Sequence, residues 1–238
     1  MSKFKLIIKS LLPKKFLNFY YQLKIKNKKY YGQNKMDKKL LRYLNYKNRF
    51  FIELGANDGL RQSNTYYLEK NLGWRGILIE PEKKNFLKCK KNRSTKNFYF
   101  NVACQKKNNK KKMKFLYSDL MTISLNSSNN IKNPYIHAKK GKLYLRNNEK
   151  IKKFTQNTMT LGEILNICNC NKVIDFLSLD VEGMELDVLK GVNFNKYNFR
   201  YILTESYDDK KIKSYLRSKN YRYIKKLSKR DLLFKYTY

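Results

Sequence analysis

The acidic residues of this chain are few, and several of them follow apolar runs that have the character of β-strands. Only 18 of the 238 residues are Asp or Glu, against 54 Lys and Arg. Ligands of an open α/β sheet bind beyond the carboxyl ends of its strands. We therefore expect one crevice to collect the acids that end the strand-like runs, which are Glu53, Asp58, Glu80, Asp180, Glu182 and Glu205.

Asp180 and Glu182 end the run VIDFLSL, the most apolar in the chain. At a strand end facing the crevice, they are candidates to remove a proton from a hydroxyl acceptor. Alternatively, together with Glu205 they could bind Mg²⁺ or Ca²⁺ through oxygen, and the ion would acidify the hydroxyl. Glu182 has a structural alternative, because an acid there would stabilise the amino end of the helix MELDVLKG.

The single histidine, His137, lies in the polar, Asn/Ser-rich segment 118–150. Such a segment inside an α/β domain is often a substrate loop or a lid over the site. His137 is therefore a further candidate base, although a lone histidine in a loop is more often polar surface.

A glycine-flanked turn, ELGANDG at residues 53–59, follows the first strand. Gly55 and Gly59 let the backbone approach a ligand, and Asn57 tolerates a left-handed conformation. Glu80 ends the next strand, where an acid can accept hydrogen bonds from ribose hydroxyls. The turn lacks the G-x-G-x-x-G spacing and G-K-[ST], which argues against NAD and P-loop nucleotides.

The alternation of strands and helices predicts an α/β fold with a mostly parallel, doubly wound sheet. The main domain is predicted at 48–238, with 118–150 as its substrate loop or lid, and a basic helical extension at 1–47. A capping box at Thr160–Glu163 marks one helix start. Further helices are predicted at 36–46, 62–72, 82–91 and 208–220, and strands at 74–81, 97–103, 113–117, 173–180 and 201–205, followed by a closing β pair.

The formal net charge is +36. Such a charge favours nucleic acid, an anionic membrane surface or an acidic glycan as a partner. The abundance of Lys, Asn, Ile and Tyr also fits a low-GC codon bias, and no RRM or KH pattern is visible. Residues 1–25 carry a Lys-flanked apolar face, which predicts either an interfacial helix on an anionic membrane or a helix packed on the domain.

The cysteines and the hydropathy pattern indicate the cellular compartment in which the protein is expected. The pair Cys168 and Cys170 is too closely spaced for a zinc knuckle, so reduced thiols of a cytoplasmic protein are expected. No apolar run approaches the roughly 18 residues of a membrane span, and the lysine-interrupted start does not suggest a signal peptide. We expect a cytoplasmic protein, with contact to the inner face of the membrane if residues 1–25 are interfacial.

The series ELGANDG, GWRGILIEP, TLGEIL, IDFLSLDVEGMELDVLKGVNF and ILTE resembles the FkbM-type methyltransferases over about residues 48–206. The resemblance implies an S-adenosylmethionine-dependent enzyme of the Rossmann-like class I. Its sheet would be mixed and seven-stranded, with helices on both faces and one antiparallel strand in the last hairpin. Many members act on sugar or polyketide hydroxyls.

By this resemblance, the turn residues Glu53, Gly55, Asn57 and Gly59 would line the methionine and ribose part of the cofactor. Glu80 would hold the ribose hydroxyls. Residues 101–104, which include Ala103, would flank the adenine, at a place where many methyltransferases carry an acid.

The expected activity is O-methylation of a sugar, glycan or glycolipid-type acceptor, a polysaccharide modification. The alternatives are an RNA methyltransferase, favoured by the charge, and a non-enzymatic scaffold bound to a membrane through residues 1–25.

Overall fold

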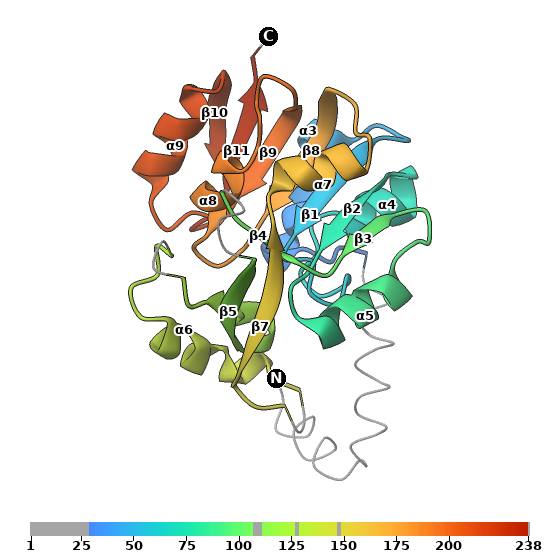
Figure 1. Ribbon diagram of the computed structural model, residues 1–238. Helices are drawn as coiled ribbons and strands as arrows, with labels where there is room; N and C mark the ends of the chain where they lie inside the picture. The colour runs from blue at the N-terminus through green and yellow to red at the C-terminus, as the bar shows by residue number, and fades with distance from the viewer. Residues whose placement is uncertain (1–28, 107–110, 127–128, 147–148, 238) are drawn as a thin grey trace.

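The computed structural model describes residues 29–106, 111–126, 129–146 and 149–237, which form two β-sheets with helices around the larger one (Figure 1). The interfacial helix expected at 1–25 lies outside the described residues, as does most of the extension 1–47. Among the helices that the structure describes, none combines the length and apolar composition needed to cross a bilayer.

The large sheet has seven strands in the order β10-β11-β9-β8-β1-β2-β3. Strand β11 runs antiparallel to β9 and β10, and the other neighbouring pairs are parallel. The predicted mixed, Rossmann-like sheet is therefore confirmed. The strands are β1 (Phe50–Leu54), β2 (Arg75–Ile79), β3 (Phe98–Phe100), β8 (Val173–Leu179), β9 (Asn198–Thr204), β10 (Tyr221–Lys226) and β11 (Leu232–Tyr236).

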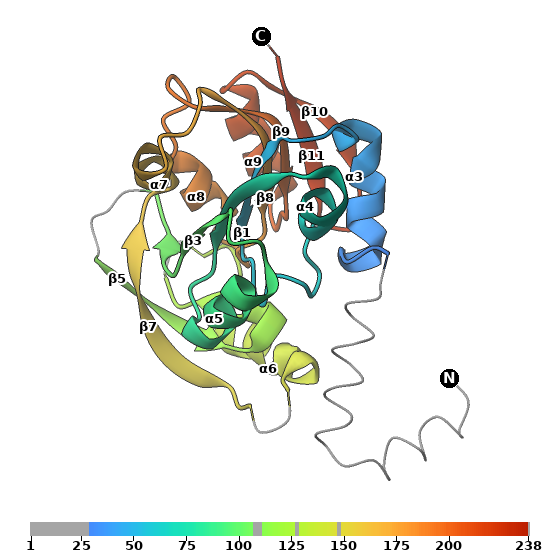
Figure 2. The ribbon, with the colours of Figure 1, turned by 90° about the vertical axis from the view of Figure 1, so that its right-hand side faces the viewer.

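Helices cover both faces of this sheet. Neighbouring residues of a strand point to opposite faces, and here the side chains on both faces are apolar and buried. Phe51 packs on one side with α3 (Met36–Leu44), α4 (Tyr66–Leu72) and α5 (Lys83–Asn92). Ile52 packs on the other side, with α7 (Leu161–Ile167), α8 (Glu185–Lys190) and α9 (Asp209–Arg217). Figure 2 shows α3 on one side of the strands and α7 and α8 on the other. The helices predicted at 36–46, 62–72 and 208–220 are confirmed with shorter bounds, and the one predicted at 82–91 is confirmed one residue further along the chain. The capping box at Thr160 is also confirmed.

The smaller sheet has the order β4-β7-β5-β6. Its strands are β4 (Ala103–Cys104), β5 (Lys112–Tyr117), β6 (Ile123–Ser124) and β7 (Lys152–Met159). The single strand predicted at 97–103 is wrong, because β3 and β4 belong to different sheets. Asn101 lies between them, and its side-chain amide donates to the carbonyls of Glu80 (2.8 Å) and Pro81 (3.0 Å).

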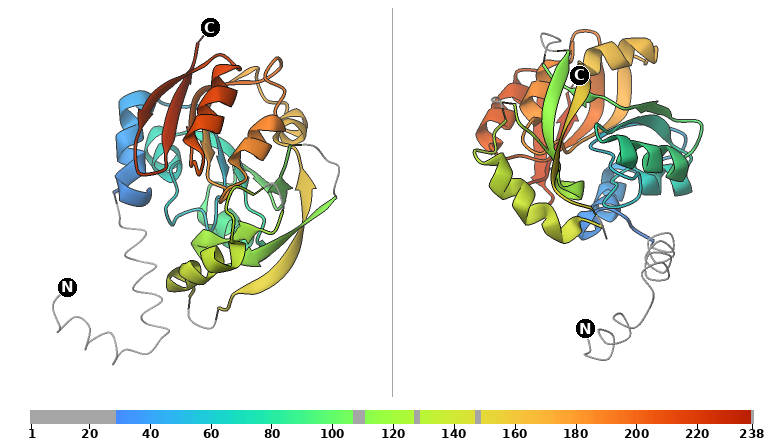
Figure 3. Two further views of the ribbon diagram at one scale, coloured as in Figure 1. Left: turned by 90° about the vertical axis from the view of Figure 1, so that its left-hand side faces the viewer. Right: turned by 60° about the horizontal axis from the view of Figure 1, so that its bottom comes forward.

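The segment predicted as a substrate loop, 118–150, contains regular elements in its described part. They are the 3₁₀ turns η2 (Asp119–Met121) and η3 (Gly141–Tyr144), strand β6 and helix α6 (Pro134–Lys140), while a further 3₁₀ turn, η1 (Gln33–Lys35), precedes α3. Asn133 caps α6, since its side chain accepts from the backbone N–H of Ile136 at 3.0 Å. Figure 3 shows α6 and the smaller sheet beside one end of the large sheet.

Candidate active site

A pocket that is partly open to solvent lies at the carboxyl ends of β1, β2 and β8. Its walls come from the turn after β1, the end of β2, the residues around β4, strand β5, turn η2 and the residues after β8. This is the position that the strand-end acids predicted, because the parallel strands end together at one edge.

The turn after β1 is built against the end of β8. Gly55 has φ +77°, and a Cβ at this residue would collide with the backbone oxygen of Asp180. The amides of Gly55 and Ala56 both donate to the carbonyl of Ile79 at 3.1 Å, so the turn is also tied to β2. Asn57 has φ +46°, which confirms the predicted left-handed conformation.

Glu80 lines the pocket from the end of β2 and is 5% exposed. Its carboxylate accepts the backbone N–H groups of Asn57 (2.9 Å) and Glu82 (2.8 Å), one on each oxygen. Burial raises the pKa of Glu80 to about 8. These two bonds orient the carboxylate and leave lone pairs for a bound hydroxyl.

Two predicted turn residues, Glu53 and Gly59, are not among the described residues that line the pocket. Glu53 is buried, and its carboxylate accepts from the hydroxyls of Ser63 (3.0 Å) and Thr65 (2.7 Å) and pairs with Arg93 at 3.1 Å. Gly59 has φ +79°, and a Cβ there would meet the side chain of Arg93. Gly55 and Asn57 thus line the pocket, whereas Glu53 and Gly59 support the turn.

One wall of the pocket is apolar. Val102, Ala103 and Cys104 face it together with Met113 and Phe115 of β5. Burial raises the pKa of the Cys104 thiol to about 12, so this thiol stays protonated. Such a wall suits a flat heterocycle, and it includes three of the residues at 101–104 predicted to flank an adenine.

Three carboxylates gather beyond β8 and β9. Ligand oxygens of Asp180, Glu182 and Glu205 all lie within 4.8 Å of one another, as the strand-end pattern predicted. Burial and its neighbour Glu182 raise the pKa of Glu205 to about 8. Asp180 lines the pocket, where part of the residue is exposed to solvent. Desolvation by the surrounding protein and repulsion from Glu205 nevertheless raise its pKa well above the usual range.

Helix α6 brings His137 to this group. Nε2 of His137 lies 3.0 Å from Oε2 of Glu182, within ion-pair distance but without the alignment of a hydrogen bond. The contact is therefore a close polar approach rather than a hydrogen bond. Tyr207 donates to the same Glu182 oxygen at 2.8 Å, and Arg230 pairs with Glu205 at 3.4 Å.

Sequence reasoning missed Tyr207, Arg230 and a second set of contacts, which join the described part of residues 118–150 to the residues after β1. Asp119 of η2 accepts from Asn57 Nδ2 (3.1 Å) and Arg61 (2.5 Å), and Arg146 pairs with Asp58. Tyr207 follows Glu205 by two residues, so its place after β9 was a usable signal. Asp119 and Arg146 lie outside any strand-end pattern, and no spacing marks them.

The sheet order and the pocket define a Rossmann-like α/β enzyme whose site combines a buried acid after β2 with carboxylates after β8. A model of the methyltransferase FkbM domain matches residues 53–223, and the chain therefore belongs to the FkbM methyltransferase family. It is a methyltransferase, and S-adenosylmethionine is the methyl donor of this family. The alternative of a non-enzymatic scaffold is accordingly wrong.

Similar solved structures include a methyltransferase from Geobacter sulfurreducens, with 11% identity, coverage of 100% of this chain and 97% of that one, and a TM-score of 0.45. A SAM-dependent methyltransferase from Aquifex aeolicus has 12% identity, coverage of 83% and 87%, and a TM-score of 0.38. These similarities are too distant to inform the acceptor. Among curated proteins, none matches this chain.

Proposed function

We propose that this methyltransferase transfers the methyl group of S-adenosylmethionine to a hydroxyl of a sugar, glycan or glycolipid-type acceptor. The observation that carries the proposal is the carboxylate group of Asp180, Glu182 and Glu205 beside the pocket. A hydroxyl must lose its proton during methyl transfer, and a carboxylate with a raised pKa is suited to accept it.

The cofactor would fill the pocket through three kinds of contact. Glu80 has lone pairs for the ribose hydroxyls, the small turn at Gly55 admits the backbone close to the ligand, and the wall that includes Ala103 takes the adenine. The carboxylates after β8 suit the sulfonium cation. These residue types fit the group, although the chain has Ala103-Cys104 where many methyltransferases have an acid.

In the proposed reaction, the acceptor oxygen attacks the methyl carbon, the carbon–sulfur bond breaks in line, and Asp180 takes the hydroxyl proton. Glu182 and His137 would assist Asp180 in removing the proton, since their contact places an imidazole next to the two acids. S-adenosylhomocysteine leaves as the second product.

The same three carboxylates offer oxygen ligands of the kind that Mg²⁺ or Ca²⁺ prefers. A metal would acidify the hydroxyl directly. Arg230 already pairs with Glu205, and Tyr207 and His137 already contact Glu182, so part of the negative charge is compensated by the protein. We favour proton removal by Asp180 for this reason.

Chelation tests this choice. We expect full methyl transfer after treatment with EDTA, because the contacts of Arg230, Tyr207 and His137 compensate the group without an ion. The measurement is the initial rate before and after EDTA, followed by addition of Mg²⁺ or Ca²⁺. Loss of activity that either ion restores would assign the three carboxylates to a metal site.

At a pH above about 8, where Glu80 is ionised, Glu80→Gln should weaken S-adenosylmethionine binding by ~2–4 kcal/mol, because charge-assisted bonds to the ribose hydroxyls are lost. The Gln amide would also turn an N–H group towards a backbone N–H that Glu80 now accepts. Titration calorimetry measures the affinity, and thermal unfolding checks that the variant is folded. Asp208→Asn, at an acid that caps α9 on the surface, is the control. Unchanged affinity in folded Glu80→Gln would remove Glu80 from the cofactor site.

The acceptor class is tested with labelled S-adenosylmethionine and separate fractions of glycans, glycolipids and RNA. Label in a glycan or glycolipid fraction supports the proposal. Label confined to RNA, or to protein, would contradict it and would give the positive charge a direct role in acceptor binding.

A further inference from the structure

Helix α6 has one face in the active site and another in solvent. His137 and Ala138 are buried, whereas Tyr135 and Ile136 are 56% and 54% exposed. Leu143 of the adjoining turn η3 is 73% exposed, the largest fraction among the large hydrophobic residues that the structure describes. Figure 3 shows α6 at the periphery of the molecule. Large apolar side chains gathered on one exposed surface often mark an interaction site.

The segment that carries this surface is strongly basic. Residues 129–153 contain eight Lys and Arg and a single acid, Glu149. The carboxylate of Glu149 is itself paired with the ammonium group of Lys88, at 3.7 Å between Oε1 and Nζ. The ammonium group of Lys153 lies 5.8 Å from the ring centroid of Tyr135, so charge and apolar surface adjoin. The basic residues are Lys132, Lys139, Lys140, Lys142, Arg146, Lys150, Lys152 and Lys153. Two of them are neutralised by acids outside this segment, since Arg146 pairs with Asp58 and Lys152 pairs with Glu82.

We propose that the outer surface of α6 and η3 docks the enzyme on an anionic lipid bilayer. This docking face consists of Tyr135, Ile136 and Leu143 with the lysines Lys139, Lys140 and Lys142. Apolar side chains would enter the region between headgroups and acyl chains, and the lysines would contact anionic headgroups. The proposal rests on the proposed function in one respect, since it makes the hydroxyl acceptor a lipid-linked sugar.

The chemistry of the apolar residues favours lipid over RNA. Single-stranded nucleic acid is held by aromatic rings on which bases stack, together with basic side chains. Two of the three apolar residues of the docking face, Ile136 and Leu143, are aliphatic and have no ring to offer. Burial of any apolar side chain in a bilayer is energetically favourable. Aliphatic residues between lysines therefore fit a bilayer better than they fit RNA.

The docking face is joined rigidly to the site. Ser118 donates to the carbonyl of Ala138 at 2.6 Å, which fixes α6 to the segment that continues into η2. Leu120 of η2 lines the pocket, and His137 contacts Glu182 from the inner side of α6. A bilayer against the outer side of α6 would therefore lie close to the carboxylates, where a headgroup hydroxyl is needed.

Co-sedimentation of the full chain with vesicles tests the proposal. The probes are vesicles of phosphatidylglycerol mixed with phosphatidylcholine, and vesicles of phosphatidylcholine alone. We expect binding to the anionic vesicles, and a loss of about tenfold or more in partitioning for the double variant Ile136→Ser/Leu143→Ser. Lys139→Glu/Lys142→Glu should weaken binding to the anionic vesicles to a similar degree.

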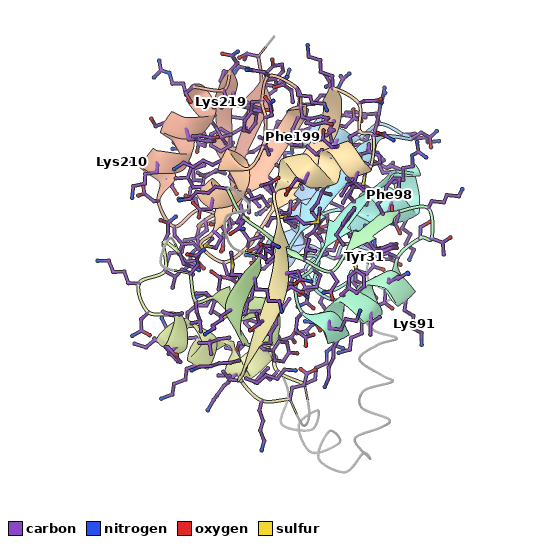
Figure 4. The ribbon with its side chains drawn as sticks, viewed as in Figure 1. Tyr31, Lys91, Phe98, Phe199, Lys210 and Lys219 are labelled. Atoms are coloured by element: carbon purple, nitrogen blue, oxygen red, sulfur yellow. The ribbon has the colours of Figure 1, made fainter. Side chains whose placement is uncertain are left out.

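Matched controls are available on other surfaces. Ile167 and Phe98 are 61% and 44% exposed on α7 and β3, so Ile167→Ser/Phe98→Ser removes comparable apolar surface elsewhere. Lys210→Glu/Lys219→Glu makes the same charge change near α9, and Figure 4 shows both lysines on the side of the molecule that carries α9. Both controls should bind the anionic vesicles like the unaltered protein.

Equal losses in the controls and the docking-face variants would overturn the proposal, because binding would then follow net charge alone. Unaltered binding by Ile136→Ser/Leu143→Ser would also overturn it and assign any membrane contact to another segment, such as residues 1–25. Sedimentation without vesicles would show self-association and overturn it as well. The assay needs no methyl transfer, so failure of the proposed acceptor class is scored separately.

Discussion

Asp180→Asn should lower the rate of methyl transfer by ~100-fold or more, the usual effect of losing a general base. Asn has nearly the same shape, so the fold and the S-adenosylmethionine affinity should stay close to those of the unaltered enzyme. The carboxylate of Asp180 faces the pocket and belongs to a group of three acids, whereas its amide replacement cannot accept the hydroxyl proton. Single-turnover rates and calorimetry on the same preparations separate these two effects.

Asp175→Asn is the matched control, because Asp175 lies in β8, the strand that Asp180 follows, but near its opposite end. Its carboxylate accepts the backbone N–H of Phe50 at 3.1 Å, and Asp175 is not among the described residues that line the pocket. The rate of the unaltered enzyme should rise with pH through a pKa above the ordinary range for Asp, since the base must be ionised. A fully active Asp180→Asn enzyme would remove Asp180 from the chemistry, and Glu205 and His137 would be tested next.

Arg93→Met should lower the free energy of unfolding by ~3–5 kcal/mol, because it leaves buried carboxylates without their cation. The Arg93 side chain is fully buried and lies 3.1 Å from Glu53 and 2.9 Å from Glu69. For a chain of this length the melting temperature should fall by roughly 10 °C. Denaturant titration and calorimetric melting measure the change.

Arg200→Met removes a comparable ion pair at the surface. Its partner atom on Asp175 is 3.3 Å away and the Arg200 side chain is 49% exposed, so the expected loss is below about 1 kcal/mol. A stable Arg93→Met protein would show that Glu53 and Glu69 do not need this cation.

The positions of the carboxylates followed from the sequence because one geometric rule governs them. Apolar runs ending in Glu80, Asp180 or Glu205 are parallel strands, and parallel strands bring their carboxyl ends to the same edge of a sheet. The mixed sheet could be predicted through the resemblance, and its antiparallel strand is β11. Asn57 was predictable as left-handed because few side chains tolerate that conformation.

The contacts of residues 118–150 were less predictable because they join residues far apart in the chain. Asp119 meets Asn57 and Arg61, and Arg146 meets Asp58 across 88 residues. No periodicity indicates such pairs. Glu53 illustrates a second difficulty, since a strand-end acid can turn towards a buried arginine rather than towards the ligand, and the choice depends on the distant Arg93.

The central pairing of β1 with β8 has a consequence for how the protein is made. Phe51 pairs with Phe176 in this ladder, so 125 residues separate the partners, whereas β2 follows β1 closely. Closing so long a loop slows folding. At ribosomal rates of about 5–20 residues per second, one edge of β1 would stay unpaired for roughly 6–25 s while the intervening residues are synthesised. An unpaired apolar strand edge invites association with other chains. Chains truncated before β8 should therefore aggregate, and chaperones should engage the nascent protein during that interval.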